Sequence, residues 1–202
     1  MTPATSSTAP RLLAFDTSTE TMAITACGPA GAAGWVGPGG AAASATLLVR
    51  AHEVLAAAGL SLPELDAVAF GAGPGAFTGL RTACAVAQGL AFGLDRPVLA
   101  IDSLALVAED TGWHDGAPVW VAMDARMDEL YVAAYRWHGT GGVGWRPETA
   151  PALVPLDVLV ARWAAQPPAR VAGSGLRAFG ARLPTGGAEL RPHEHDRAAA
   201  LP

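Results

Sequence analysis

The chain has 202 residues, of which 51% are hydrophobic and 15% charged, with a formal net charge of −5. This length suffices for one large or two small domains, and the acidic balance argues against a protein that grips nucleic acid by itself, because phosphate contacts depend on clustered cations. All thirteen basic residues are arginines, which excludes a Walker lysine, a Schiff-base lysine and a Ser–Lys dyad.

The first half of the sequence has the pattern of strands alternating with helices. Residues 1–10 are rich in Thr, Ser, Ala and Pro and lack the basic and apolar segments of a signal peptide, so we expect a disordered tail and a cytoplasmic protein. Strands are predicted at 12–15, 21–27, 34–37, 66–70 and 97–101, and helices at 41–58 and 78–93. This order is typical of helices packed on a mixed sheet.

The second half continues as another α/β unit. Helices are predicted at 103–113 and 155–165, and strands at 119–123, 130–137 and 169–172. The polar residues 124–129 are expected to form a bend between two strands, and no helix is expected after Glu189. We therefore expect two α/β lobes, residues 11–105 and 106–202.

The stretch from Phe70 to Gly93 is the one around which the chain is organised. It contains a glycine-rich loop, residues 71–75, which suits a tight strand-to-helix turn because glycine reaches backbone angles that other residues avoid. Thr78 is expected to cap the helix that follows. Small residues recur every four positions along this helix, at Gly79, Ala83, Ala87 and Ala91. The residues alone leave two interpretations open: this stripe packs in the chain's own core, which is the commoner case, or it meets another subunit.

Two polar clusters are candidates for chemistry. Asp16-Thr17-Ser18-Thr19 follows a predicted strand and could hold a phosphate, with Asp16 positioning a metal or a water, but an ordinary polar turn fits the same residues. The cluster of Asp124, Arg126, Asp128 and Glu129 suits acid–base or ligand work, and salt bridges that stabilise a bend explain it equally well. Neither cluster by itself indicates a particular reaction.

The remaining motifs are weaker. The segment His193-Glu194-His195-Asp196 lacks the HExxH spacing, and His52 is a lone histidine on a predicted helix, so no metal site is expected. Ser174 lacks the GxSxG context of a nucleophile elbow. Cys27 and Cys84 have no CxxC spacing and are expected to be packing thiols.

Three motifs occur in one order with suitable spacing. They are LAFDTST at 13–19, GAGPGAFTGLRTACAVAQGLAFG at 71–93 and AMDARMDELYVAAY at 122–135. Together they resemble the TsaB family, also called YeaZ, over a range from Arg11 to the end of the chain. The first two motifs are shared with the larger relative TsaD and similar actin-like ATPases, whereas the segment around Asp124 and Arg126 points to TsaB.

The resemblance implies an α/β actin-like ATPase (ASKHA, ribonuclease H-like) fold of two related lobes. In this family the TsaB subunit is held to be non-catalytic, while TsaD binds ATP and metal and transfers the threonylcarbamoyl group to the tRNA adenosine beside the anticodon. The implied residues are a vestigial nucleotide loop, Asp16, Thr17, Ser18 and Thr19, and a signature loop, Gly73, Pro74, Gly75, Thr78 and Gly79. No catalytic residue and no cofactor of its own are expected, in keeping with the absence of a TsaD-like histidine pair from helix 41–58.

The resemblance also implies a heterodimer with TsaD through the first two helices. The interface is then expected at Leu47, Ala51, Val54, Gly79, Ala83, Ala87 and Ala91. Further expected partners are TsaE and, mainly through the complex, tRNA; no membrane is expected, and a homodimer is left open for the isolated chain.

Two departures from the family pattern stand out. The closing helix with its Tyr-Leu-Arg segment is not found, so we expect a C-terminal lobe truncated at its end, and alanines at 41–45 replace more polar residues, except at Ser44. The alternative function is an independent ATPase or kinase-like enzyme that uses Asp16 and the glycine loop. A metallopeptidase, which follows only from older naming of the wider family, is the weakest alternative.

Overall fold

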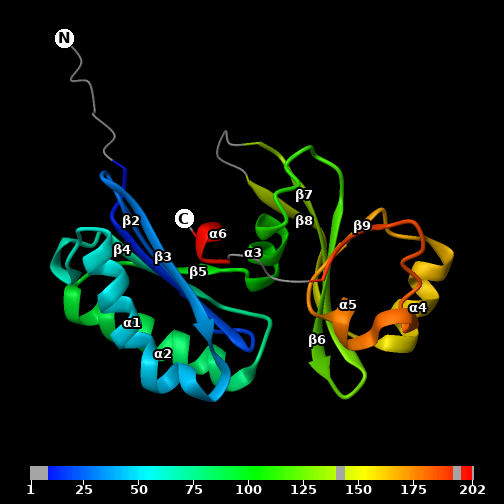
Figure 1. Cartoon of the computed structure of the whole chain (residues 1–202), viewed down its shortest axis with the longest axis horizontal. Helices are drawn as coiled ribbons and strands as arrows, with labels where there is room; N and C mark the ends of the chain where they lie inside the picture. The colour runs from blue at the N-terminus through cyan, green and yellow to red at the C-terminus, as the bar shows by residue number, and fades with distance from the viewer. Residues whose placement is uncertain (1–8, 140–143, 193–196, 202) are drawn as a thin grey trace, which may run out of the picture.

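The computed structural model describes residues 9–139, 144–192 and 197–201. Over these ranges the chain forms two five-stranded sheets with helices against them (Figure 1). The first lobe contains β1 (Leu12–Asp16), β2 (Thr21–Gly28), β3 (Gly31–Pro38), α1 (Ala43–Ala57), β4 (Ala67–Gly71), α2 (Phe77–Leu94) and β5 (Val98–Ile101). The helix α3 (Ser103–Asp110) leads to the second lobe, with β6 (Val119–Arg126), β7 (Glu129–Trp137), β8 (Trp145–Pro155), α4 (Leu156–Ala165), β9 (Arg170–Ala172), α5 (Gly175–Phe179), β10 (Glu189–Arg191) and α6 (Arg197–Ala200).

The two sheets have the same topology. The first has the order β3-β2-β1-β4-β5 and the second β8-β7-β6-β9-β10. In each sheet the first three strands are antiparallel neighbours, and the fourth and fifth extend the first in parallel. A helix also follows the third, fourth and fifth strand of each lobe. This duplicated order is that of a ribonuclease H-like unit used twice, so the expected actin-like fold with two related lobes is confirmed.

The helix that follows the fifth strand lies between the sheets in both lobes (Figure 1). Helix α3 packs on the second sheet, where Leu104 and Val107 join a core with Val121 of β6. Helix α6 packs instead on β2 and β3 of the first sheet and on α3. Alanines of the first sheet meet Leu106 of α3 and Ala198 of α6 in this layer. The two lobes are therefore joined by a layer of two short helices, one from each repeat.

The opposite face of the first sheet is covered by α1 and α2. Leu13, Phe15 and Ile24 of the sheet pack against Leu47 of α1 and Ala87 of α2. The stripe of small residues on α2 therefore faces the chain's own core, and it is what lets the helix backbone approach the sheet closely. Gly79, Ala83, Ala87 and Ala91 are the four buried residues of α2.

This burial corrects the interface expected from the sequence. All seven residues assigned to a subunit contact, Leu47, Ala51, Val54, Gly79, Ala83, Ala87 and Ala91, are buried inside the first lobe. The core interpretation of the stripe is confirmed, and its interpretation as a contact surface is wrong. Helix spacing alone identifies a face of small residues but does not say what covers it.

Several local predictions also differ from the structure. Helix α2 begins at Phe77 with Ala76 as its N-cap and no side-chain cap, so Thr78 is not the cap. Strand β8, at Trp145–Pro155, was not predicted, because its three prolines disfavour a strand and are tolerated on an outer strand of a sheet. The strand β10 and the short helices α5 and α6 were also missed, and α6 is a helix after Glu189 where none was expected. The tail 1–10 falls outside the described residues except for its last two.

Candidate functional site

The turn after β1 is a buried cluster of hydrogen bonds centred on Asp16. This carboxylate has no exposed surface. Its Oδ1 accepts from the backbone N–H of Ser18 at 2.8 Å and from the Ser18 hydroxyl at 2.6 Å. Its Oδ2 accepts from the hydroxyl of Ser103, the first residue of α3, at 2.5 Å. Asp16 thus connects its own turn with the start of the helix that leads to the second lobe.

A buried arginine completes this cluster. Arg197, the first residue of α6, is 1% exposed, and its Nη1 donates to Asp16 Oδ1 at 2.7 Å. Its Nη2 donates to Thr19 Oγ1 at 2.7 Å and to the carbonyl oxygen of Thr21 at 2.6 Å. The cost of burying a charge is high unless the charge is paired and hydrogen-bonded, and here both conditions are met. The expected nucleotide loop is therefore held by a cation from this chain's own last helix.

The glycine loop packs directly on the same turn. A Cβ at Gly71 would overlap Asp16 Oδ2, and a Cβ at Gly75 or Gly79 would overlap the carbonyl oxygen of Ser18 or Thr17. The hydroxyl of Thr17 donates to the carbonyl oxygen of Gly79 at 2.7 Å. These three glycines are explained by the close approach of the two loops. The structure thus brings together both loops that the sequence singled out, with Gly73 joined through its N–H to Ser103 at 3.1 Å.

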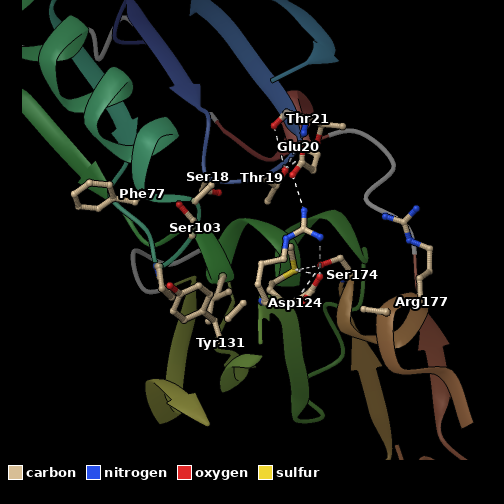
Figure 2. A pocket seen from close by; sticks show the side chains of 18 residues that line it. Ser18, Thr19, Glu20, Thr21, Phe77, Ser103, Asp124, Tyr131, Ser174 and Arg177 are labelled. Carbon is tan, nitrogen blue, oxygen red and sulfur yellow. Dashed lines mark hydrogen bonds and ion pairs between the residues drawn. The ribbon is translucent and has the colours of Figure 1, made fainter. Parts of the chain in front are cut away.

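A cavity of about 790 Å³ lies between the two lobes beside this cluster (Figure 2). Its first-lobe wall comes from the β1–β2 turn and the start of α2, and its second-lobe wall from the end of β6, from β7 and from α5. The wall includes Ser18, Thr19, Phe77, Asp124, Tyr131 and Arg177. Figure 2 shows that these side chains come from opposite sides of the cleft. The cavity is of a size that small-molecule sites have.

The charged cluster of the second half lies on the β6–β7 hairpin at the rim of this cavity. Arg126 contacts Glu20 of the first lobe at 2.8 Å and Asp124 at 3.5 Å. Arg126, Met127 and Asp128 all have positive φ, from 54° to 68°, an uncommon conformation for residues with side chains. A register shift between Asp124 and Arg126 accompanies it. The expected bend is thus a tight hairpin with a bulge, and its arginine reaches across to the other lobe.

Other sequence candidates lie apart from this cluster or have a structural role. Ser174 accepts from the N–H of Asp124 at 3.1 Å, and the glycines beside it fit against the carbonyl oxygen of Ala122. His52 is exposed on α1. The segment 193–196 lies outside the described residues, and within the described ones no group of three or more His, Cys, Asp or Glu side chains could hold a metal. Cys27 and Cys84 are free thiols and half-buried.

A second contact ties α3 to the second lobe. The hydroxyl of Tyr135 on β7 donates to Asp102 Oδ2 at 2.5 Å, directly before α3. Burial, together with this hydrogen bond to a carboxylate and its negative charge, raises the pKa of Tyr135 well above its usual value. Tyr135 therefore stays protonated and keeps the donor role on which the contact depends.

The outer face of the α1–α2 pair exposes several apolar side chains. Phe92 of α2 is 93% exposed, and Leu48 and Val49 of α1 are 47% and 58% exposed. Phe77, at the start of α2, is 66% exposed but lines the cavity between the lobes. Ala85, Gly89 and Gly93 form a second stripe of small residues on α2, two positions out of register with the buried one, and a Cβ at Gly89 or Gly93 would have open space around it. Exposed aromatic side chains beside small residues on a helix pair are typical of a docking surface.

Sequence reasoning missed Arg197, Ser103 and the outer face of α2. Arg197 lies in a polar terminal segment, and no local pattern connects it with Asp16. Ser103 had a weak signal, since Asp102-Ser103 precedes a predicted helix. The outer stripe had a clear sequence signal, because Ala85, Gly89 and Gly93 recur every four positions, as the residues of the buried stripe do.

Comparisons with known proteins agree with the geometry. A family model described as TsaD, tRNA N6-adenosine threonylcarbamoyltransferase, matches residues 38–143. The tRNA threonylcarbamoyladenosine biosynthesis protein TsaB of Escherichia coli K12 is 36% identical over 145 residues, which cover 64% of this chain and 59% of that protein. The protein of the same name from Haemophilus influenzae is 47% identical over 88 residues, 43% of this chain and 37% of that protein. The chain therefore aligns with less than two thirds of the length of either curated relative.

Solved structures are similar over more of the chain. YeaZ from Pseudomonas aeruginosa has 34% sequence identity and a TM-score of 0.77, covering 95% of this chain and 90% of that one. A second structure, described as similar to peptidase YEAZ from the same organism, has 36% identity and a TM-score of 0.78, covering 95% of this chain and 89% of that one.

Among the described residues, no helix is long and apolar enough to cross a bilayer.

Proposed function

The chain belongs to the TsaB (YeaZ) family, and we propose that it is the non-catalytic partner subunit of a TsaD-type threonylcarbamoyltransferase in tRNA threonylcarbamoyladenosine biosynthesis. Its role is to bind and activate the enzyme that modifies the adenosine beside the anticodon. The observation that carries this proposal is the exposed apolar face of the α1–α2 pair.

That face has the character of a protein interface. Phe92 is 93% exposed although it is a large aromatic side chain, and aromatic residues anchor many protein–protein contacts. The small residues Ala85 and Gly89 would let a partner helix approach closely beside it. The face lies on the side of the first sheet opposite α3 and α6, so it is accessible whatever occupies the cavity (Figure 1).

The interior of the first lobe supports a role without catalysis. Both carboxylate oxygens of Asp16 accept hydrogen bonds from within the chain, from Ser18, Ser103 and Arg197. The glycines of the signature loop are packed against the backbone of the β1–β2 turn. Groups that would be expected to contact a nucleotide therefore have partners within the chain.

The remaining assignments follow from the family. ATP and the metal are proposed to bind TsaD, TsaE to join the complex, and tRNA to be contacted mainly through the complex, in keeping with the net charge of −5. We place the protein in the cytoplasm. The same outer face could pair two copies of this chain when TsaD is absent, and TsaD would then replace the second copy.

The proposal is tested by light scattering of this chain alone and mixed with its TsaD. The unchanged chain should form a one-to-one complex. Val49→Glu should weaken it roughly hundredfold or more, because a charge buried without a partner costs several kcal/mol. Gly89→Glu, on the neighbouring helix, should do the same, and its Cβ meets no other atom in the isolated chain.

Val158→Glu is the matched control, since Val158 is 53% exposed on α4 of the other lobe and Val49 is 58% exposed on α1. Equal loss of binding in both valine variants, or no loss in either, would remove the proposal. ATP hydrolysis by the chain alone, abolished by Asp16→Asn, would indicate an independent ATPase instead.

A further inference from the structure

At its first-lobe end, the cavity between the lobes is bordered by polar groups that already bond one another. The hydroxyls of Ser18 and Ser103 donate to Asp16, and the backbone N–H of Gly73 donates to Ser103. The N–H of Ala76 in the glycine loop donates to the carbonyl oxygen of Ser18 at 2.7 Å. An anionic group at this end would have to displace these internal hydrogen bonds.

The charged side chains of the cavity wall leave a different place for an anion. Glu20 and Asp124 share Arg126, which lies 2.8 Å from the first and 3.5 Å from the second. Arg177 of α5 also lines the cavity. Within the part of the chain that the structure describes, its guanidinium makes no hydrogen bond or ion pair. The positive charge available to a ligand is therefore that of Arg177.

A hydroxyl lies one helical turn from this arginine. Ser174, directly before α5, is three residues from Arg177, and residues at this spacing are neighbours on a helix surface. Its Oγ accepts from the N–H of Asp124 at 3.1 Å, while its own proton faces the sulfur of Met123 at 3.8 Å. Sulfur is a weak acceptor. Ser174 and Arg177, both on the second-lobe side of the cavity in Figure 2, can therefore donate to one anionic group.

Much of the remaining wall is apolar. Pro74 and Phe77 contribute from the first lobe, Leu104 from α3, and Met123 and Tyr131 from the second sheet. Phe77 is 66% exposed, and the hydroxyl of Tyr131 has no hydrogen-bond partner among the described residues. Apolar and aromatic side chains with a few polar groups are typical of a pocket for a ligand with an apolar body.

We propose that the cavity binds a small apolar monoanion, a carboxylate on an aromatic or aliphatic body. Its charged group lies at Arg177 and Ser174, and its body lies against Phe77, Leu104 and Tyr131. The single available guanidinium matches one negative charge, whereas a polyphosphate is normally held by several backbone N–H groups and cations. This inference goes beyond the proposed function, since it concerns the cavity and not the outer helix face, and it holds whether or not TsaD binds.

Ligand-observed NMR titrations of the full chain with phenylpropionate and the neutral phenylpropionamide test the charged end. The unchanged protein should bind the carboxylate roughly tenfold more tightly, because hydrogen bonds to charged groups are the stronger ones. Arg177→Gln should remove this difference. Arg162→Gln is the matched control, since Arg162 is an exposed arginine of the same lobe that stacks on Trp120 outside the cavity, and it should keep the tenfold preference.

Two phenylalanines of α2 test the apolar end. Phe77 and Phe92 are both exposed, but Phe77 lines the cavity and Phe92 does not. Phe77→Ala should weaken the binding of both probes about fivefold, because apolar contact area is lost whatever the charge of the ligand. Phe92→Ala should leave the binding of both probes unchanged.

The proposal is overturned if neither probe binds at millimolar concentration, or if the unchanged protein binds both equally. Loss of binding in Phe92→Ala with none in Phe77→Ala would place the probes on the outer face of α1–α2 instead. Tighter binding of Mg²⁺ and ATP than of phenylpropionate, unaffected by Arg177→Gln, would also overturn it, since the anion would then bind at the Asp16 end.

Discussion

The turns after the first strand of each lobe share a hydrogen bond to an aspartate but differ in environment. In the first lobe the N–H of Ser18 donates to Asp16 Oδ1 at 2.8 Å, and in the second the N–H of Arg126 donates to Asp124 Oδ1 at 2.9 Å. Asp16 has no exposed surface, whereas the side chain of Asp124 is 21% exposed. The duplicated fold therefore keeps one aspartate turn as an interior joint and the other as part of a cleft wall.

The helices that cover the outer faces of the two sheets also differ between the lobes, in their length and in the apolar residues that they expose. Helices α1 and α2 have 15 and 18 residues, whereas their equivalents α4 and α5 have 10 and 5. The longer pair carries the exposed Phe77, Phe92, Leu48 and Val49. On α4 only Val158 is a comparably exposed large apolar residue among the described ones.

The two copies of the duplicated fold therefore differ in which surfaces they leave exposed. The first lobe has a closed interior and an apolar outer face, and the second has shorter helices and forms the other side of the cavity. The β1–β2 turn and the glycine loop of the first lobe make internal contacts, while its helices present exposed apolar side chains.

The two aspartates should differ most. Asp16→Ala removes a buried carboxylate that accepts hydrogen bonds from Ser18, Ser103 and Arg197, and should lower the free energy of unfolding by roughly 3–5 kcal/mol. Asp124→Ala loses one hydrogen bond in a partly exposed turn and should cost about 1 kcal/mol. Urea unfolding of both variants measures the difference, and equal losses would mean that Asp16 is not the joint described above.

Replacing two glycines of α2 by alanine should change the stability of the fold in opposite directions. A Cβ at Gly79 would overlap the carbonyl oxygen of Thr17, so Gly79→Ala should destabilise by about 1–3 kcal/mol or more. Gly89 lies in the helix interior with open space around it, so Gly89→Ala should stabilise by about 0.5–1 kcal/mol. Thermal unfolding distinguishes them, and a stabilising Gly79→Ala would contradict the close approach of the two loops.

The surface ion pair of Asp115 with Arg170 should have the smallest effect. The hydrogen bond from Arg170 lowers the pKa of Asp115 to about 2, so the carboxylate stabilises the fold above its unfolded pKa and loses this contribution as the pH falls through about 2. Asp115→Asn should therefore be slightly less stable than the unchanged protein at neutral pH, and the difference should disappear as the pH falls below about 2. Unfolding curves across this range check the convergence, and a gap that widens in acid would contradict the sign.

Much of the fold could be predicted from the sequence because it depends on local patterns. The strands near Leu12 and Thr21 and the helix 155–165 were predicted from apolar spacing and turn residues, and the structure has them. Strand β8 was hidden by its prolines, and α6 by its brevity. Such elements are stabilised by contacts with a neighbouring strand or lobe. These contacts are not visible in a short stretch of sequence.

The candidate site was only half predictable. The β1–β2 turn and the glycine loop are continuous motifs, so their residues could be named in advance. The partner of Asp16 could not, because Arg197 lies 181 residues further along the chain and no local pattern connects the two. The interface residues were placed on the wrong face of α2, since two stripes of small residues fit the same helical period and only burial separates them.

The most direct test of the partner surface is oxidative footprinting of the chain with and without TsaD. Phe92 on α2 and Met127 on the β6–β7 hairpin are 93% and 92% exposed, so both should be oxidised in the free chain. Binding should protect Phe92 and leave Met127 unchanged. Protection of Met127 with Phe92 still exposed would contradict the account and place the partner on the second lobe.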